Sequence, residues 1–191
     1  MGDMARNDER RSTLADAGIR VLAEQGARGL THRAVDAAAR TPRGTASNYF
    51  PTRDDLISAL VDRIGERLTP EPEAASSRTA RTPDRELFAE YLRDVVRRLS
   101  VDPHVSLALF ELRLEAARRP AVAKALGAWR QRAFEEDVRF NDGAGLPGGR
   151  SEIALFHYAI DGLMLDHLTT PIDTGLSVDA AIDEFVDRIL Q

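Results

Sequence analysis

Apolar residues recur at intervals of three and four along most of the chain, which is the spacing of one face of an α-helix. Strand-like alternation of apolar and polar positions is nearly absent. Two of the clearest stripes are formed by Leu14, Ala17, Gly18, Val21 and Leu22, and by Leu56, Leu60, Ile64 and Leu68. The pattern therefore predicts an all-α protein.

Turn and capping residues divide the first part of the chain. A first helix, capped by Asp8 or Ser12, is expected to run to Gln25, where Gly26 and Gly29 end it. A second short helix is expected from the N-cap Thr31 through Ala39, since threonine accepts a hydrogen bond from a free N–H of the first turn.

Two prolines bound the third helix. Thr41 and Pro42 are expected to open it, because proline has no N–H to leave unsatisfied at a first helical position. Pro51 ends it near Phe50, and Thr52 followed by Asp55 has the spacing of a capping box that opens a fourth helix to about residue 68. Phe50 is expected to pack inward.

Two breaks interrupt the rest of the chain. The segment 69–84 has prolines and no periodicity, and the segment 141–149 holds four glycines and a proline, so both are expected to be loops. Helices are expected near 84–100, 103–118, 119–139, 150–170 and 177–190, which gives about nine helices in all.

The two short helices within 31–50 cannot be stable alone and must pack on the first and fourth helices. This arrangement is a helix-turn-helix. The exposed face of its second helix is expected to carry groups that donate to phosphates or base edges, while Gly44 and Ala46 keep that helix slim. These groups are Arg43, Thr45, Ser47 and Asn48, followed by the hydroxyl of Tyr49. The alternative is a helical hairpin whose polar residues are simply solvated.

Charge is unevenly distributed, although the net charge is −5. Residues 1–53 carry nine arginines against six acidic residues, and the remainder is acidic. A basic N-terminal part is compatible with a nucleic-acid partner. The chain has no cysteine, which excludes a disulfide framework or a thiolate metal site. With no apolar signal segment and no membrane span, a soluble cytoplasmic protein without a membrane partner is expected.

The stretch "LTHRAVDAAARTPRGTASNYFPTRDDLISAL" resembles the DNA-binding domain of the tetracycline-repressor (TetR/AcrR) family of bacterial transcriptional regulators. The resemblance covers about residues 8–68. It implies that Thr31 and Arg33 contact phosphates, and that Tyr49 and Arg53 bind the DNA backbone. It also implies that the four polar residues of the third helix, from Arg43 to Asn48, face the major groove.

Three positions depart from the family pattern. Arg40 stands where the family commonly has glycine, Pro42 where it commonly has a capping serine, and Ser47 where tyrosine is frequent. Because a non-glycine residue in a left-handed conformation costs about 1 kcal/mol, we expect Thr41 to cap the third helix and the turn to differ by one residue. The change at Ser47 affects base preference more than DNA binding.

The resemblance further implies two domains: a helix-turn-helix domain at 1–52, and a ligand-binding and dimerisation domain at 53–191, with the helix at 53–68 connecting them. The segment 150–170 is apolar on more than one face, so one face can pack within the chain and the other against a second subunit. The predicted dimer interface consists of Phe156, Ile160, Leu163, Met164, His167, Ile182, Phe185 and Ile189.

Large apolar residues on the middle helices are either core or the lining of a ligand pocket. These are Leu107, Phe110, Leu114, Trp129 and Phe134, with Glu111, His157, Tyr158 and Asp161 as polar groups that could orient a ligand. The expected ligand is a small, partly apolar effector, and no cofactor is expected.

No sequence motif of a catalytic site is found. His157 and Asp161 stand four residues apart, which can ligate a metal, but a hydrogen-bonded pair is the more ordinary interpretation, and we predict no metal site. The leading hypothesis is a homodimeric regulator, usually a repressor, that binds a near-palindromic operator in double-stranded DNA and is released by its effector. The alternatives are a helical-bundle enzyme or small-molecule carrier, and an adaptor whose hairpin binds protein.

Overall fold

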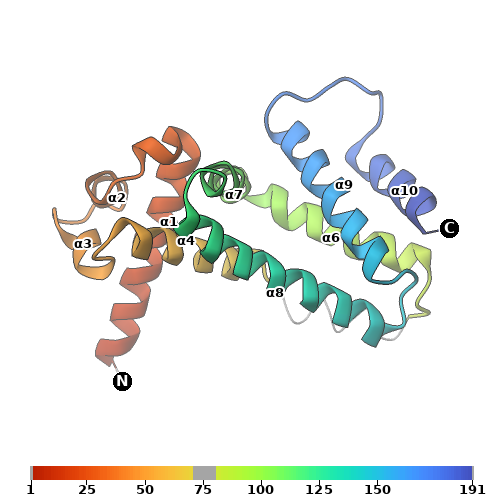
Figure 1. The fold of residues 1–191 in the computed structure, drawn as a ribbon, viewed down its shortest axis with the longest axis horizontal. Helices are drawn as coiled ribbons and strands as arrows, with labels where there is room; N and C mark the ends of the chain where they lie inside the picture. Colours follow the sequence, from red (N-terminus) through yellow and green to blue (C-terminus); the bar gives the residue numbers. More distant parts are fainter. Residues whose placement is uncertain (1, 71–80, 191) are drawn as a thin grey trace. The chain divides into compact units, whose positions relative to one another are not determined.

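The structure is a computed structural model that describes residues 2–70 and 81–190, with side chains from Arg6 onward. All regular structure in these residues is helical, which confirms the predicted fold class (Figure 1). The helices are α1 (Gly2–Gly29), α2 (His32–Ala38), α3 (Thr45–Tyr49), α4 (Arg53–Leu68), α6 (Arg85–Val101), α7 (Pro103–Ala116), α8 (Pro120–Ala144), α9 (Arg150–Leu168) and α10 (Val178–Ile189). None of the helices in the described ranges is long and apolar enough to cross a bilayer.

The described chain forms two compact units. The first contains Met1–Thr69 and His104–Trp129, and the second contains Pro70–Pro103 and Arg130–Gln191. The first unit thus holds α1 to α4, nearly all of α7 and the first turns of α8. The functional boundary predicted between residues 52 and 53 is a different division, and it stays a prediction.

The first helix is longer than expected. It begins at Gly2, so that Asp8 and Ser12 lie inside it and do not cap it, in a stretch of arginine, methionine and alanine that favours helix. The glycine signal at its end was informative, because Gly26 has φ 66° and ψ −178° and interrupts the helical geometry there. The chain resumes helical turns as far as Gly29.

The core of the first unit is formed largely by α1 and α4, and the second and third helices pack onto it. Phe50 has no exposed surface and packs in one cluster with Val35 and Leu56, which confirms that its ring points inward. The same cluster takes in apolar residues of α1, α7 and the first turns of α8. The short helices α2 and α3 are therefore held by longer ones, as their length requires.

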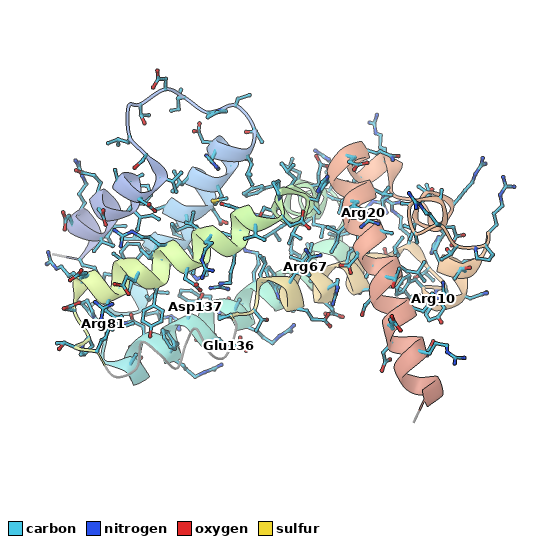
Figure 2. The ribbon with its side chains drawn as sticks, turned by 180° about the vertical axis from the view of Figure 1, so that it is seen from behind. Arg10, Arg20, Arg67, Arg81, Glu136 and Asp137 are labelled. Carbon is cyan, nitrogen blue, oxygen red and sulfur yellow. The ribbon has the colours of Figure 1, made fainter. Side chains whose placement is uncertain are left out.

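The start of α4 confirms the predicted capping box. The Thr52 hydroxyl oxygen accepts the Asp55 N–H at 3.1 Å, and the Asp55 carboxylate accepts the Thr52 N–H at 2.9 Å. Further along α4, Arg63 donates two hydrogen bonds to Asp16 of α1, each 2.9 Å long. Arg67 on the next turn, labelled in Figure 2, donates to the same carboxylate at 3.2 Å. These bonds fix α4 against α1.

The second unit packs α6, α9 and α10 together. The Phe88 ring of α6 lies 4.8 Å from that of Phe156 on α9, and Ile182 of α10 has no exposed surface. Arg93 of α6 binds the carboxylate of Asp183 on α10. The unit therefore has its own apolar core and its own polar ties.

The two predicted breaks differ in what the structure describes. Of the segment 69–84, residues 71–80 lie outside the described part; Asp84 caps α6, accepting the Leu87 N–H at 2.8 Å. The other break is shorter than predicted because α8 continues to Ala144. Buried Asn141 then donates to the Gly148 carbonyl at 2.9 Å, which closes the loop before α9.

Candidate nucleic-acid interface

The helix-turn-helix consists of α2, the turn at residues 39–44 and α3, which lie beside α1 and α4 in Figure 1. Thr31 caps α2 as predicted, its hydroxyl oxygen accepting the Ala34 N–H at 3.1 Å. This hydrogen bond fixes the first turn of α2, at the N-terminal end of the helix-turn-helix.

The turn itself corrects the prediction for α3. This helix begins at Thr45 and does not begin at Thr41–Pro42, because the chain passes through left-handed conformations at Arg40 (φ 53°) and Gly44 (φ 88°) first. Glycine adopts such a conformation without steric cost, so Gly44 serves the turn and is not a slim helical position. Thr41 does not cap α3, since its hydroxyl lies 3.4 Å from a carboxylate oxygen of Asp36.

Asp36 is a site residue that the sequence reasoning missed. Its side chain is 3 % exposed, and its two oxygens accept the backbone N–H groups of Gly44 at 2.8 Å and Ala46 at 2.7 Å. The available signal was an acidic residue next to Val35 on the apolar side of a short helix, where a charge needs strong partners.

The C-terminal end of α3 is held by two side chains that were also missed. His32 Nε2 lies 2.6 Å from the Phe50 carbonyl oxygen, and Arg11 donates to the Tyr49 carbonyl at 3.4 Å. The Arg11 guanidinium also lies over the Phe50 ring, 4.9 Å from its centroid. Side chains from α1 and α2 therefore meet α3 at both of its ends.

Arg43, Ser47 and Asn48 are exposed, as a surface that contacts DNA requires, and Thr45 is half-buried. The hydroxyls of Thr45 and Ser47 already donate to backbone carbonyls three residues earlier, at 2.6 and 3.0 Å. Their oxygens remain able to accept hydrogen bonds. The side chains of Arg43 and Asn48 have no partner among the described residues, so they are the donors best placed for a ligand.

The four residues expected to contact the DNA backbone have different surroundings. Thr31 and Arg33 are exposed and Tyr49 is half-buried. Arg53 points into the protein, where its guanidinium donates to the carbonyls of Leu30 and Ala27, the latter at 2.5 Å. Its charge lies near the start of α4, but its donors are used largely to join α4 to the end of α1.

Comparison with known proteins agrees with this geometry. Residues 83–191 match the tetracyclin repressor-like C-terminal domain, and residues 14–60 match the bacterial regulatory proteins of the tetR family. The chain belongs to the TetR family. The N-terminal match includes α2, α3 and the turn between them, so these elements form the helix-turn-helix of a TetR-family transcriptional regulator.

Solved structures of TetR-type proteins cover nearly the whole chain. A TetR family member from Streptomyces coelicolor A3 is 28% identical, with a TM-score of 0.71 over 96% of this chain and 99% of that one. The multidrug binding protein EbrR is 28% identical in its complex with imidazole (TM-score 0.66, 95% of both chains). In its complex with ethidium it is 26% identical (TM-score 0.67, 95% of this chain and 99% of that one). No curated protein matches the chain.

In this TetR-family chain the predicted pocket residues fall into two groups. Leu107, Phe110, Glu111, Leu114 and Trp129 lie in the first unit, and Phe134, His157, Tyr158 and Asp161 lie in the second. Leu114 is 56% exposed and Tyr158 is 68% exposed. The Trp129 indole packs so closely on α4 that a Cβ at Gly65 would lie 2.5 Å from its Nε1, which is a core contact.

Two polar members of the second group, His157 and Asp161, already have protein partners, whereas Tyr158 is largely exposed. Asp161 accepts a hydrogen bond from Arg130 at 3.0 Å. His157 Nε2 lies 2.9 Å from a carboxylate oxygen of Asp137, labelled in Figure 2, and its ring meets that of Phe134 edge-on at 5.5 Å. Within the described residues no group of three or more histidine, aspartate or glutamate side chains could hold a metal ion.

A surface hollow of about 230 Å³ lies in the first unit, lined by Ala27, Arg28, Arg53, Glu115 and Arg119. None of the nine predicted pocket residues borders it. Its lining carries three arginines and Glu115, whose carboxylate pairs with Arg119 at 2.7 Å, whereas a pocket for a partly apolar effector is lined mainly by apolar side chains.

The predicted dimer residues also divide. Four are buried in their own chain: Phe156, Ile160, Met164 and Ile182. Leu163, Phe185 and Ile189 are half-buried, and His167 is exposed. The face of α9 that remains open carries other apolar side chains, namely Leu155 (49% exposed), Tyr158 (68%) and Leu165 (47%). We call these three residues the open face of α9.

Proposed function

We propose that this TetR-family chain is a homodimeric transcriptional repressor that reads a near-palindromic operator with α3 and leaves it when a small effector binds. The observation that carries the proposal is the exposure of Arg43 and Asn48 at a five-residue helix within the matched DNA-binding segment. Because the family consists of regulators, the same match supports the expectation that the chain is not an enzyme.

The chemistry of these two side chains suits the major groove. An arginine donates two hydrogen bonds to the O6 and N7 atoms of guanine, and an asparagine pairs with the N6 and N7 atoms of adenine. The exposed Ser47 beside them is small, which allows close approach of the helix to base edges. Arg33 and Tyr49 would contact phosphates, which fixes the position of the helix without specifying sequence.

Dimerisation is proposed through the open face of α9. Leu155, Tyr158 and Leu165 recur at intervals of three and seven residues on one side of the helix, and contiguous exposed apolar residues commonly mark an interaction surface. Pairing α9 and α10 with their copies would form a four-helix interface. The buried residues first predicted for this interface would then support it from inside the chain.

The effector is proposed to bind in the helical domain that follows residue 52, with α4 connecting it to the DNA-binding domain. EbrR, which is similar over 95% of this chain, is described in complexes with imidazole, proflavin, ethidium and malachite green. These support a small, partly apolar effector here. An effector that prefers the conformation with misplaced recognition helices lowers DNA affinity by the same coupling factor, typically about 1–3 kcal/mol.

The test is binding to duplex DNA selected from a random-sequence library by the wild-type protein. We expect Arg43→Ala to weaken binding by about 1–3 kcal/mol, roughly 5- to 150-fold, because one bidentate base contact is lost. The control is Arg85→Ala, which removes an exposed arginine from α6, outside the helix-turn-helix. Failure to enrich any duplex, or equal losses in the two variants, would contradict the proposal.

A further inference from the structure

The position of α3 cannot be set by α3 itself. The helix has five residues, Thr45–Tyr49, which is far fewer than an isolated helix needs to be stable in water. Its N-cap residue is Gly44, which has no side chain with which to cap the free N–H groups of the first turn. Some other group must satisfy these donors.

The Pro42 carbonyl accepts the Thr45 N–H at 3.2 Å, while Asp36 satisfies the N–H groups of Gly44 and Ala46. Asp36 Oδ2 accepts the Gly44 N–H at 2.8 Å, and its Oδ1 accepts the Ala46 N–H at 2.7 Å. The Thr41 hydroxyl lies 3.4 Å from Oδ1, on the other side of the turn. The carboxylate of Asp36 thus connects α2 to Thr41 and Gly44 of the turn and to Ala46 in the first turn of α3.

The negative charge of Asp36 serves neither solvation nor attraction to DNA. A carboxylate that is 3 % exposed is costly unless hydrogen bonds compensate its lost hydration. Its negative charge would also repel DNA phosphates, so it does not assist binding by attraction. What the carboxylate contributes is the position of the turn, through two charge-assisted hydrogen bonds to backbone groups.

We propose that Asp36 is a positioning residue for DNA recognition: it acts as a distant N-cap that aims α3, and with it Arg43 and Asn48, at the base edges. This inference rests on the proposed function. His32 and Arg11 hold the opposite end of α3 through the carbonyls of Phe50 and Tyr49. The helix is therefore clamped at its two ends by α1 and α2.

The sign of the effect distinguishes positioning from electrostatics. Asp36→Asn keeps the size of the side chain but replaces one acceptor oxygen by an NH₂ donor, which cannot accept a backbone N–H. Positioning predicts that operator affinity falls about tenfold, the usual scale for a lost hydrogen bond to a charged group. Removal of a negative charge without a positioning role would leave the affinity unchanged or raise it.

The matched control is Asp62→Asn, which removes the same charge from an exposed position on α4. A surface change of this kind is expected to alter affinity by no more than about twofold. Binding to the selected duplex and to an unrelated duplex is measured for both variants, with folding checked by circular dichroism. Asp36→Asn should lose selected-site binding while it keeps binding to the unrelated duplex, because the phosphate contacts remain.

Hydrogen exchange in the wild-type protein gives a second reading that does not depend on a variant. The amides of Gly44 and Ala46 should exchange more slowly than that of Arg43, which has no acceptor among the described residues. Equal exchange at the three amides, or an Asp36→Asn protein with unchanged or tighter operator binding, overturns the inference. A wild-type protein that binds no duplex contradicts the proposed function instead.

Discussion

The DNA-binding segment and helix α9 differ in the kind of side chain that they expose: polar in the first, apolar in the second. Around α3 the aromatic ring of Phe50 is fully buried while Arg43 and Asn48 are left in solvent. On α9 the apolar residues Leu155 and Tyr158 are exposed, whereas the carboxylate of Asp161 is bound to Arg130.

The contrast indicates two kinds of partner. Uncommitted polar donors beside a buried core suit a partner with hydrogen-bond acceptors, as DNA has. An uncovered apolar stripe suits a second protein surface, since exposed apolar patches on soluble proteins commonly mark interaction sites. The predictions below test whether each surface has the role that its chemistry suggests.

The largest expected effect is on the free energy of unfolding, and it compares the buried ring of Phe50 with the exposed ring of Tyr158. Phe50→Ala should lower the free energy of unfolding by about 3–5 kcal/mol, because the ring is fully buried and its loss leaves a cavity. Tyr158→Ala should change it little under conditions where the protein is monomeric, since that ring is 68% exposed. Urea unfolding monitored by circular dichroism measures both, and similar losses would mean that the two surfaces do not differ.

The second effect concerns the open face of α9. Leu165→Asp should raise the dimer dissociation constant by roughly thirtyfold or more, the change that accompanies the loss of an interface hot spot of about 2 kcal/mol. Analytical ultracentrifugation over a range of concentrations measures it. Ser151→Asp, an exposed change on the same helix, is the control. An unchanged dimer in Leu165→Asp would place the interface elsewhere.

The smallest effect is a pH dependence within the second unit. Two hydrogen bonds from Arg150, at 2.8 and 2.6 Å, lower the pKa of Glu135 from 4.5 to about 2. Because the folded-state pKa is the lower one, the pair contributes stability above pH 4.5 and loses it as the pH falls toward 2. The side chain of Arg150 is 56% exposed and that of Glu135 is 35% exposed, so solvent screens the pair and its contribution is small.

To test this ion pair, the free energy of unfolding is measured as a function of pH for the wild type and for Arg150→Gln. Their free energies of unfolding should differ most near neutral pH and converge as the pH falls through this window. A difference that stays constant with pH would mean that Arg150 acts through its contact with the Phe134 ring, 4.7 Å away, and not through Glu135.

Sequence reasoning was most successful where the signal is local. The caps at Thr31 and Thr52 and the helix break at Gly26 each depend on residues within a few positions. The helix-turn-helix followed from local signals of this kind, and the family from the resemblance of the whole stretch that contains it.

It failed where distant residues decide the outcome. The start of α3 depends on Asp36, which lies in the preceding helix and replaces a local cap. Likewise, both sides of α9 are apolar, so the pattern could not tell which side α6 and α10 would cover. The inward side proved to hold Phe156 and Met164, two of the residues first assigned to a dimer interface.

Methylation by dimethyl sulfate tests the central claim most directly, because it modifies guanine N7 in the major groove and adenine N3 in the minor groove. With the selected duplex, we predict two groups of guanines protected by the wild-type protein, centred about one helical turn apart or a multiple of it. Arg43→Ala should remove that protection at its guanine contact. Protection of adenines alone, or a single protected half-site, would contradict an account in which two copies of α3 lie in the major groove.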